Sequence, residues 1–315
     1  MNIMIFGGGA VGLGLARSLI ASKNDVTIID VEPTVTALKT SGIVQTGVLG
    51  NYTINPEQFT VYSLLQEIQN KEFDYICVCI KSYMSSAVAK IFNDNKTIIG
   101  DCPIILFQNG WGNAEHFIKY FDKKRIFNAR VMTGYIKPQL HHVDITVHAD
   151  EIHIGSLFNG DIHTVKPIAD ALTEGNMPAN IVSHVAKDIW AKMLYNCALN
   201  PLGALFNVPY GELGKSEYTK AIMNDIFKEI FETMKLAGYT THYSNADEYI
   251  DVFYSTLLPS TGEHRSSMLQ DIQAKRQTEI DALNGAVVEL AKQCGCVTPV
   301  NEMITYLIKF LELKR

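Results

Sequence analysis

A glycine-rich turn near the N-terminus constrains the fold of this chain more than any other feature. The run Gly7-Gly8-Gly9-Ala10-Val11-Gly12 fits the pattern G-x-G-x-x-G, and it separates an expected strand from an expected helix, which is the context that the pattern requires. The first glycine permits a tight turn, the second lets a diphosphate approach the backbone, and the third lets helix and strand pack closely. Because N–H groups at the helix start face an anion, we expect residues 7–12 to bind a dinucleotide.

An acidic residue follows the glycine turn at the spacing that a dinucleotide site needs. Asp30 lies 18 residues after Gly12, at the end of the expected second strand. A carboxylate there accepts hydrogen bonds from the adenosine ribose and repels a 2′-phosphate, which NADP sites usually meet with arginine or lysine. In residues 30–39 the first cation is Lys39, nine residues after Asp30, so no cation lies nearby for such a phosphate. We therefore predict NADH rather than NADPH as the cofactor; FAD, S-adenosylmethionine and a turn without a ligand are the alternatives.

The distribution of apolar residues predicts two domains of different class. Short apolar runs at 2–6, 26–29, 75–80 and 103–107 are each followed by a helical pattern, as in a parallel sheet covered on both faces. Residues 144–148 and 151–154 alternate in polarity and are separated by an expected turn, which suggests an antiparallel addition. After about His184 only helical patterns remain. We predict an α/β, Rossmann-type doubly wound, mostly parallel sheet in residues 1–183 and an all-α domain in residues 184–315.

Composition excludes several classes of protein. The 315 residues are 47% hydrophobic and carry a formal net charge of −6, whereas nucleic acids and anionic membranes require a cationic surface. No apolar run approaches the roughly 18–20 residues of a membrane-spanning helix, and no basic leader precedes Gly7, so we expect a cytoplasmic protein. The cysteine pairs Cys77/Cys79 and Cys294/Cys296 do not have zinc-site spacing, and we expect reduced thiols and no metal.

The most informative segment outside the glycine turn is an apolar stretch with three polar interruptions. Lys192, Asn196 and Asn200 follow one another at intervals of four residues within residues 190–201, so they form one stripe on a predicted buried helix. Burial of an ammonium group and two amides without partners is costly. These side chains therefore either pair with other protein groups or line a polar ligand cleft.

A second polar cluster lies in residues 264–281. Ser267 and Glu279 are 12 residues apart, so on one helix they would project within ~120° of each other. Asp271, Lys275 and Arg276 are expected to form a solvated face. Periodicity does not distinguish Glu279 from its neighbours.

Two further polar residues directly follow predicted strands of the first domain. Lys81 follows the strand at 75–80, and Asn109 lies within Gln108-Asn109-Gly110 after the strand at 103–107. In open parallel sheets, ligands bind beyond the carboxyl ends of the strands. Each of these residues is therefore placed either to contact a cofactor or to form an ordinary turn.

Taken together, these segments resemble the ketopantoate reductase (2-dehydropantoate 2-reductase) family, whose members make pantoate for coenzyme A synthesis. The resemblance covers nearly the whole chain in family order, and it rests on residues 9–12, 80–82, 108–110, 190–201, 266–271 and 278–281. It implies a reductase of two domains that uses NADH or NADPH and a small 2-oxo acid. The oligomeric state is left open, a homodimer included.

The resemblance also implies roles for individual residues. Lys192 is similar to the family's general acid, and Glu279 to the carboxylate that binds substrate near the reacting carbon. Asn196, Asn200 and Ser267 resemble residues that hold the substrate, whereas Asn109 and Lys81 resemble cofactor-side residues. An acid at this place agrees with the chemistry, because negative charge grows on the carbonyl oxygen as hydride arrives.

The chain departs from the family pattern at three positions. Asp30 stands where members that use NADPH carry a basic residue. Tyr210 and His264 stand where some members have asparagine. The last two departures favour a second hypothesis, reduction of another small 2-oxo acid. A dinucleotide sensor without turnover is a third hypothesis, and the presence of both Lys192 and Glu279 argues against it.

Overall fold

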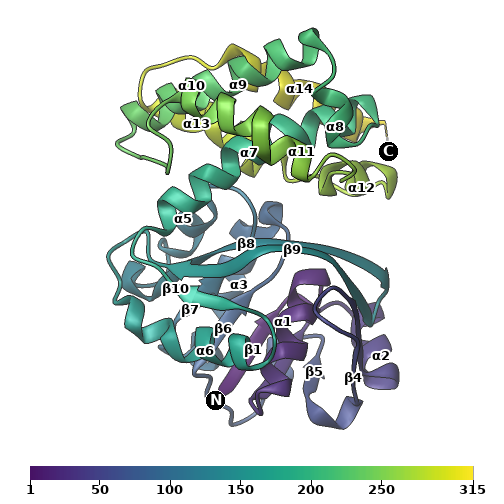
Figure 1. Cartoon of the computed structure of the whole chain (residues 1–315). Coiled ribbons are helices and arrows are strands. Elements are labelled where there is room, and N and C mark those ends of the chain that lie inside the picture. Colours follow the sequence, from purple (N-terminus) through teal and green to yellow (C-terminus); the bar gives the residue numbers. More distant parts are fainter. Residues whose placement is uncertain (315) are drawn as a thin grey trace. The chain divides into compact units, whose positions relative to one another are not determined.

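The computed structural model describes residues 1–314, which form two compact units (Figure 1). The first unit comprises Met1–Gln108 and Asn113–Val185, and the second comprises Asn109–Gly112 and Ala186–Arg315. A segment of four residues from the first half of the sequence therefore belongs to the second unit. Within residues 1–314, each helix is too short or too polar to cross a membrane.

The first unit is built on a single mixed sheet. Its strands are β1 (Asn2–Phe6), β2 (Asp25–Ile29), β3 (Ile43–Gly47), β4 (Tyr52–Ile54), β5 (Thr60–Tyr62), β6 (Tyr75–Val78), β7 (Ile104–Leu106), β8 (Ile126–Gln139), β9 (His142–Gly155) and β10 (Ala179–Ile181). The order across the sheet is β4-β3-β9-β8-β7-β6-β1-β2-β5, and β10 pairs with β9. Six adjacent strands, β8, β7, β6, β1, β2 and β5 in sheet order, run parallel. This confirms the predicted doubly wound class.

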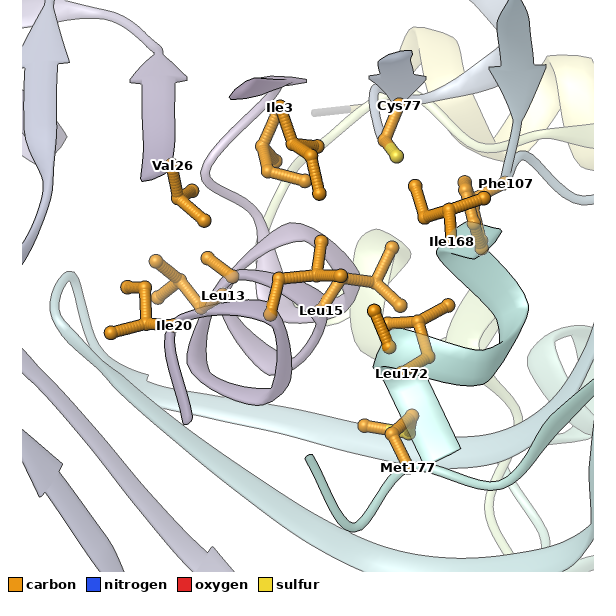
Figure 2. Packing of buried hydrophobic residues seen from close by; sticks show 14 of the residues in the cluster. Ile3, Leu13, Leu15, Ile20, Val26, Cys77, Phe107, Ile168, Leu172 and Met177 are labelled. Carbon is orange, nitrogen blue, oxygen red and sulfur yellow. The ribbon is translucent and has the colours of Figure 1, made fainter. Parts of the chain in front are cut away.

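Helices cover both faces of the parallel strands. The helices of this unit are α1 (Ala10–Ala21), α2 (Glu32–Ser41), α3 (Ser85–Asp94), α4 (Lys96–Ile99), α5 (Asn113–Phe117) and α6 (Lys166–Glu174). Figure 2 shows Leu15 of α1 and Leu172 of α6 packed beneath Ile3 of β1. The neighbouring strand residue, Met4, packs on the opposite face with Phe92 of α3. Both faces are thus buried, which is why the strands read as continuous apolar runs, and each buried Leu or Ile contributes roughly 1.5–3 kcal/mol.

One expectation for this unit is wrong. Residues 144–148 and 151–154 are not two strands separated by a turn, because both lie within the single strand β9, which pairs antiparallel with β8 (Figure 1). The intervening Ala149 and Asp150 are exposed but extended. Irregularities in the β8–β9 register near Arg130 and Met132 shift the alternation of buried residues there. This interruption of the pattern imitates a turn signal.

The second unit is entirely helical over its described residues. Its helices are α7 (Val185–Phe206), α8 (Tyr210–Leu213), α9 (Glu217–Leu236), α10 (Ala246–Val252), α11 (Leu258–Ser260), α12 (Ser267–Gln273), α13 (Asn284–Gln293) and α14 (Pro299–Leu313), with a π-helical turn at Phe253–Leu257. The predicted all-α class of the second half is confirmed. Helix α9 packs on α13 and α14, which lie against each other.

Candidate active site

The glycine turn lies where the winding of the sheet reverses direction. Strand β1 has β2 on one side and β6 on the other, so the turn after β1 and Lys81 after β6 lie at neighbouring carboxyl ends. In doubly wound sheets this switch point is where dinucleotides bind. Lys81 is half-buried and begins the short 3-10 turn Ser82–Met84. The glycine turn and Lys81, both predicted on the cofactor side, therefore lie at the carboxyl ends of neighbouring strands of one sheet.

The geometry of residues 7–12 fits a dinucleotide. A Cβ atom on Gly12 would lie 1.9 Å from the Gly7 carbonyl oxygen, and Gly7 itself has φ +108°. A Cβ on Gly9 would instead meet only the Cys79 carbonyl oxygen, at 3.8 Å, so space is left where a diphosphate would approach. Helix α1 starts after Gly9 with no side-chain cap and no acidic residue in its first turn. Its N-terminal dipole thus remains available to an anion.

Asp30 lies directly beside this turn. A Cβ on Gly8 would lie 2.8 Å from Asp30 Oδ2, so only glycine at position 8 leaves the carboxylate in place. Asp30 Oδ1 accepts a hydrogen bond of 2.7 Å from the Val31 backbone N–H. The carboxylate is therefore held at the tip of β2, the place from which an acidic residue reaches the ribose in dinucleotide sites.

The three polar residues of the stripe all lie on α7, as predicted. Asn196 and Asn200 are 9% and 6% exposed, and Lys192 is half-buried. Pro201 lies inside this helix and has no N–H for the carbonyl four residues earlier. That carbonyl, of Cys197, instead accepts a hydrogen bond of 3.0 Å from Asn284 Nδ2. The second unit thus stabilises α7 beside Asn200 with a side-chain amide from α13.

Lys192 is held by a residue that sequence order places far from it. Its Nζ donates a hydrogen bond of 2.6 Å to Asn109 Oδ1. The segment Asn109–Gly112 is fixed in the second unit by a 2.8 Å hydrogen bond from the Trp111 N–H to the Ala282 carbonyl and by the Trp111–Trp190 ring contact at 4.8 Å. Gly110 has φ +90°, and a Cβ there would clash with Ala282. Asn109, which the sequence predicts on the cofactor side, is therefore directly hydrogen-bonded to Lys192, the predicted general acid.

Three predicted substrate residues, Asn200, Ser267 and Glu279, line one pocket of the second unit. Its lining consists of Asn109, Asn200, Ser267, Met268, Asp271, Glu279 and Leu283. Asn196 lies one helical turn before Asn200 and is not part of this lining. The helical spacing that we expected between Ser267 and Glu279 is wrong, because α12 ends at Gln273 and Glu279 precedes the 3-10 turn Ile280–Ala282. A change of chain direction after α12, rather than a shared helix face, brings both residues to the pocket.

Asp271 was expected on a solvated face, and this expectation is also wrong. The residue is 2% exposed, lines the pocket, and accepts a 2.9 Å hydrogen bond from Arg276 Nε. Helical periodicity alone did not reveal it, because its neighbours Gln270 and Gln273 are polar as well. Within residues 1–314, no group of three His, Cys, Asp or Glu side chains is arranged to hold a metal ion.

Tyr210 and His264, the two departures from the family pattern, pack against each other, and Tyr210 contacts Asn200. We call this ring pair the aromatic wall. The Tyr210 hydroxyl donates a hydrogen bond of 2.6 Å to Asn200 Oδ1, and the His264 ring lies 5.2 Å from the Tyr210 ring. Burial raises the pKa of Tyr210 well above its ordinary value and lowers the pKa of His264. Both rings are therefore neutral near pH 7. The hydrogen bond to Oδ1 fixes the orientation of the Asn200 amide, whose NH2 group can donate to a ligand.

Comparison with known proteins identifies the family. Residues 3–159 match the domain described as "Ketopantoate reductase PanE/ApbA", and residues 184–312 match "Ketopantoate reductase PanE/ApbA C terminal". A 2-dehydropantoate 2-reductase of Aquifex aeolicus (strain VF5) is 36% identical over 318 residues, with 99% of this chain and 97% of that protein covered. Another, of Pyrococcus abyssi (strain GE5 / Orsay), is 27% identical, with 98% and 97% covered.

Solved structures share the fold of this chain. D-Mandelate dehydrogenase in a ternary structure with NADH and anilino(oxo)acetate superposes with a TM-score of 0.87 and 25% identity, over 100% of this chain and 99% of that one. The 2-dehydropantoate 2-reductase of Geobacter metallireducens GS-15 has a TM-score of 0.88 at 22% identity, over 98% and 99%, and shows the same fold. The chain, matched by both family domains over most of its length, belongs to the ketopantoate reductase family.

Proposed function

We propose that this protein reduces the C2 carbonyl group of 2-dehydropantoate to a hydroxyl group, with a reduced nicotinamide dinucleotide as the hydride source. The observation that carries this proposal is the 2.6 Å hydrogen bond from Lys192 to Asn109, a residue of the pocket that Asn200, Ser267 and Glu279 also line. We further propose residues 1–183 as the dinucleotide-binding domain and residues 184–315 as the substrate domain, with residues 7–12, Asp30, Lys81 and Asn109 on the cofactor side.

Lys192 acts as the general acid in this proposal. When bound, the reduced nicotinamide supplies the hydride that reaches the carbonyl carbon. Negative charge then grows on the carbonyl oxygen, and the Lys192 ammonium group stabilises it and transfers a proton to it. Asn109 Oδ1 accepts a hydrogen bond of 2.6 Å from this ammonium group. This hydrogen bond orients the ammonium group within the pocket.

The remaining pocket residues bind and orient the substrate. Tyr210 orients the Asn200 amide through its Oδ1, and the NH2 donors of this amide suit the carboxylate and hydroxyl oxygens of a 2-oxo acid. Ser267 adds a hydroxyl group to the lining. Asn196, one helical turn before Asn200 on α7 and outside the lining, adds a second amide. Glu279, which is 7% exposed, accepts a hydrogen bond from the substrate hydroxyl group near the reacting carbon. Met268, Leu283 and the buried Asp271 complete the lining.

Purified protein is expected to oxidise NADH or NADPH when 2-dehydropantoate is added, as measured by the loss of absorbance of the reduced cofactor. A panel of 2-oxo acids with small, branched and aromatic substituents, compared by kcat/KM, tests the substrate. We expect 2-dehydropantoate to have the highest value. A higher kcat/KM for another acid would make that 2-oxo acid, rather than 2-dehydropantoate, the substrate. The aromatic wall of Tyr210 and His264 favours this second candidate. Cofactor binding without turnover of any acid would contradict reductase activity.

Asp30 is expected to make NADH the preferred cofactor, with kcat/KM for NADH at least roughly tenfold above that for NADPH, because charge-assisted hydrogen bonds to the ribose stabilise binding by about 1.5–3 kcal/mol. Asp30→Ala should lower kcat/KM for NADH by a similar factor and so reduce the ratio of kcat/KM for NADH to that for NADPH. Asp25→Ala, at the opposite end of β2 and paired with Lys71, is the matched control. A strong NADPH preference of the unmodified protein would contradict this role.

A further inference from the structure

A lysine distant in sequence reaches the glycine turn. Lys137 lies near the end of β8, and its Nζ donates a 2.8 Å hydrogen bond to the Gly8 carbonyl oxygen. Residues 31–38, which follow Asp30, contain no lysine or arginine, but the long β8–β9 hairpin brings a cation to this turn from a different part of the sequence. The cofactor side of the first unit thus has a positive charge that linear spacing does not reveal.

This ammonium group is in an environment that favours an anionic partner. Lys137 is half-buried, and burial lowers its pKa, while the negative charge of nearby Asp30 opposes that shift. The Gly8 carbonyl accepts one of its three N–H groups. A partly desolvated cation is stabilised most by a charged hydrogen-bond acceptor, and a carbonyl oxygen is only a neutral one.

Lys137 is not required to hold its own strand in place. Two residues earlier on β8, Tyr135 packs so closely on α1 that a Cβ on Gly14 would lie 2.9 Å from its ring. Beyond Lys137, Gln139 pairs with His142 at the start of β9. Contacts on both sides of Lys137 thus fix the hairpin, so the ammonium group is available for a ligand.

We propose that Lys137 binds the diphosphate of the dinucleotide cofactor, an inference that rests on the cofactor part of the proposed function. The bound diphosphate carries about two negative charges beside the carboxylate of Asp30, whereas the N-terminus of α1 offers only about half a positive charge. Residues 7–12 contain no charged side chain. Lys137, together with Lys81 after β6, supplies the missing positive charge. The hydrogen bond from Lys137 Nζ to the Gly8 carbonyl oxygen places the ammonium group at the turn before the cofactor binds.

Equilibrium binding of adenine nucleotides to the full-length protein tests this assignment without any turnover. Lys137→Met should weaken 5′-ADP binding about tenfold or more, leave adenosine and 2′-AMP binding unchanged, and leave the Tm unchanged. Lys137→Arg should retain most of the 5′-ADP affinity, because it keeps the charge. Lys90→Met, which removes an exposed lysine from α3, is the matched control and should behave as the unmodified protein.

Two outcomes would overturn the assignment. Unchanged 5′-ADP affinity in Lys137→Met would mean that the lysine only contacts the turn, and a selective loss of 2′-AMP binding would place it at a 2′-phosphate instead. Chemical acetylation of the unmodified protein provides a second measurement that needs no variant. 5′-ADP should protect Lys137 from acetylation and adenosine should not; equal labelling with both would contradict the proposal. Neither result depends on the 2-oxo acid assay, so failure here is distinguishable from failure of the reductase proposal.

Discussion

Replacing Lys192 by alanine is expected to lower kcat for reduction of the 2-oxo acid by at least about 100-fold, because a positioned general acid typically contributes 10²–10⁴-fold. The variant loses both the transferable proton and the positive charge beside the developing alkoxide. It also leaves Asn109 Oδ1 without the ammonium donor that lies 2.6 Å away. Steady-state kinetics at saturating substrate and cofactor measures the effect.

The specificity of this result depends on two controls. Lys187→Ala removes a lysine from the same helix, five residues earlier, and should leave kcat close to that of the unmodified protein. The dissociation constant of NADH for Lys192→Ala should also be unchanged, because the residues of the glycine turn are unaltered. An unchanged kcat in Lys192→Ala would remove this residue from the mechanism.

Replacing Gly12 by alanine is expected to abolish measurable cofactor binding and to destabilise the first unit. The added Cβ would lie 1.9 Å from the Gly7 carbonyl oxygen, a backbone atom that a rotamer change cannot move. Overpacking in a buried site costs about 1–3 kcal/mol, and relief of this clash requires α1 to move away from the turn. Calorimetry should show a lower Tm, and titration with NADH should show little binding.

Gly9→Ala provides the informative contrast. A Cβ at that position meets only the Cys79 carbonyl oxygen, at 3.8 Å, and Gly9 has φ −68°, so the fold should tolerate alanine. The methyl group would occupy the approach of the diphosphate, so NADH affinity should fall while the Tm is retained. Normal Tm and normal NADH affinity in Gly12→Ala would show that the turn adopts another geometry.

The central sheet could be predicted because its signals are local. The runs that became β1, β2, β6 and β7 are short, apolar and bounded by helical patterns, and they are buried on both faces. Strands outside the six parallel ones carry a weaker signal, since β4 has two exposed residues of three and β9 alternates irregularly. Strand β9 also pairs with β3, which is far away in sequence, and local patterns do not encode such a contact.

The candidate site could be predicted only in part, for the same physical reason. The stripe on α7 follows from helical spacing, and its residues lie as expected. By contrast, Glu279 reaches the pocket through a change of chain direction after α12, and Lys137 reaches Gly8 through a hairpin. Asp271 has the polarity of a surface residue although it is buried. The proposed limits at residues 183 and 184 remain a prediction.

The four residues from Asn109 to Gly112 limit how this protein can be dissected. They come from the first half of the gene, yet they are packed on Ala282 and Trp190 of the helical unit. A fragment that starts at residue 186 would lack them, and with them the partner of Lys192. Chimeras that exchange halves between relatives at that point would likewise join a turn from one parent to the helices of another. Recombination designs for this family therefore need to transfer the turn together with the C-terminal helices.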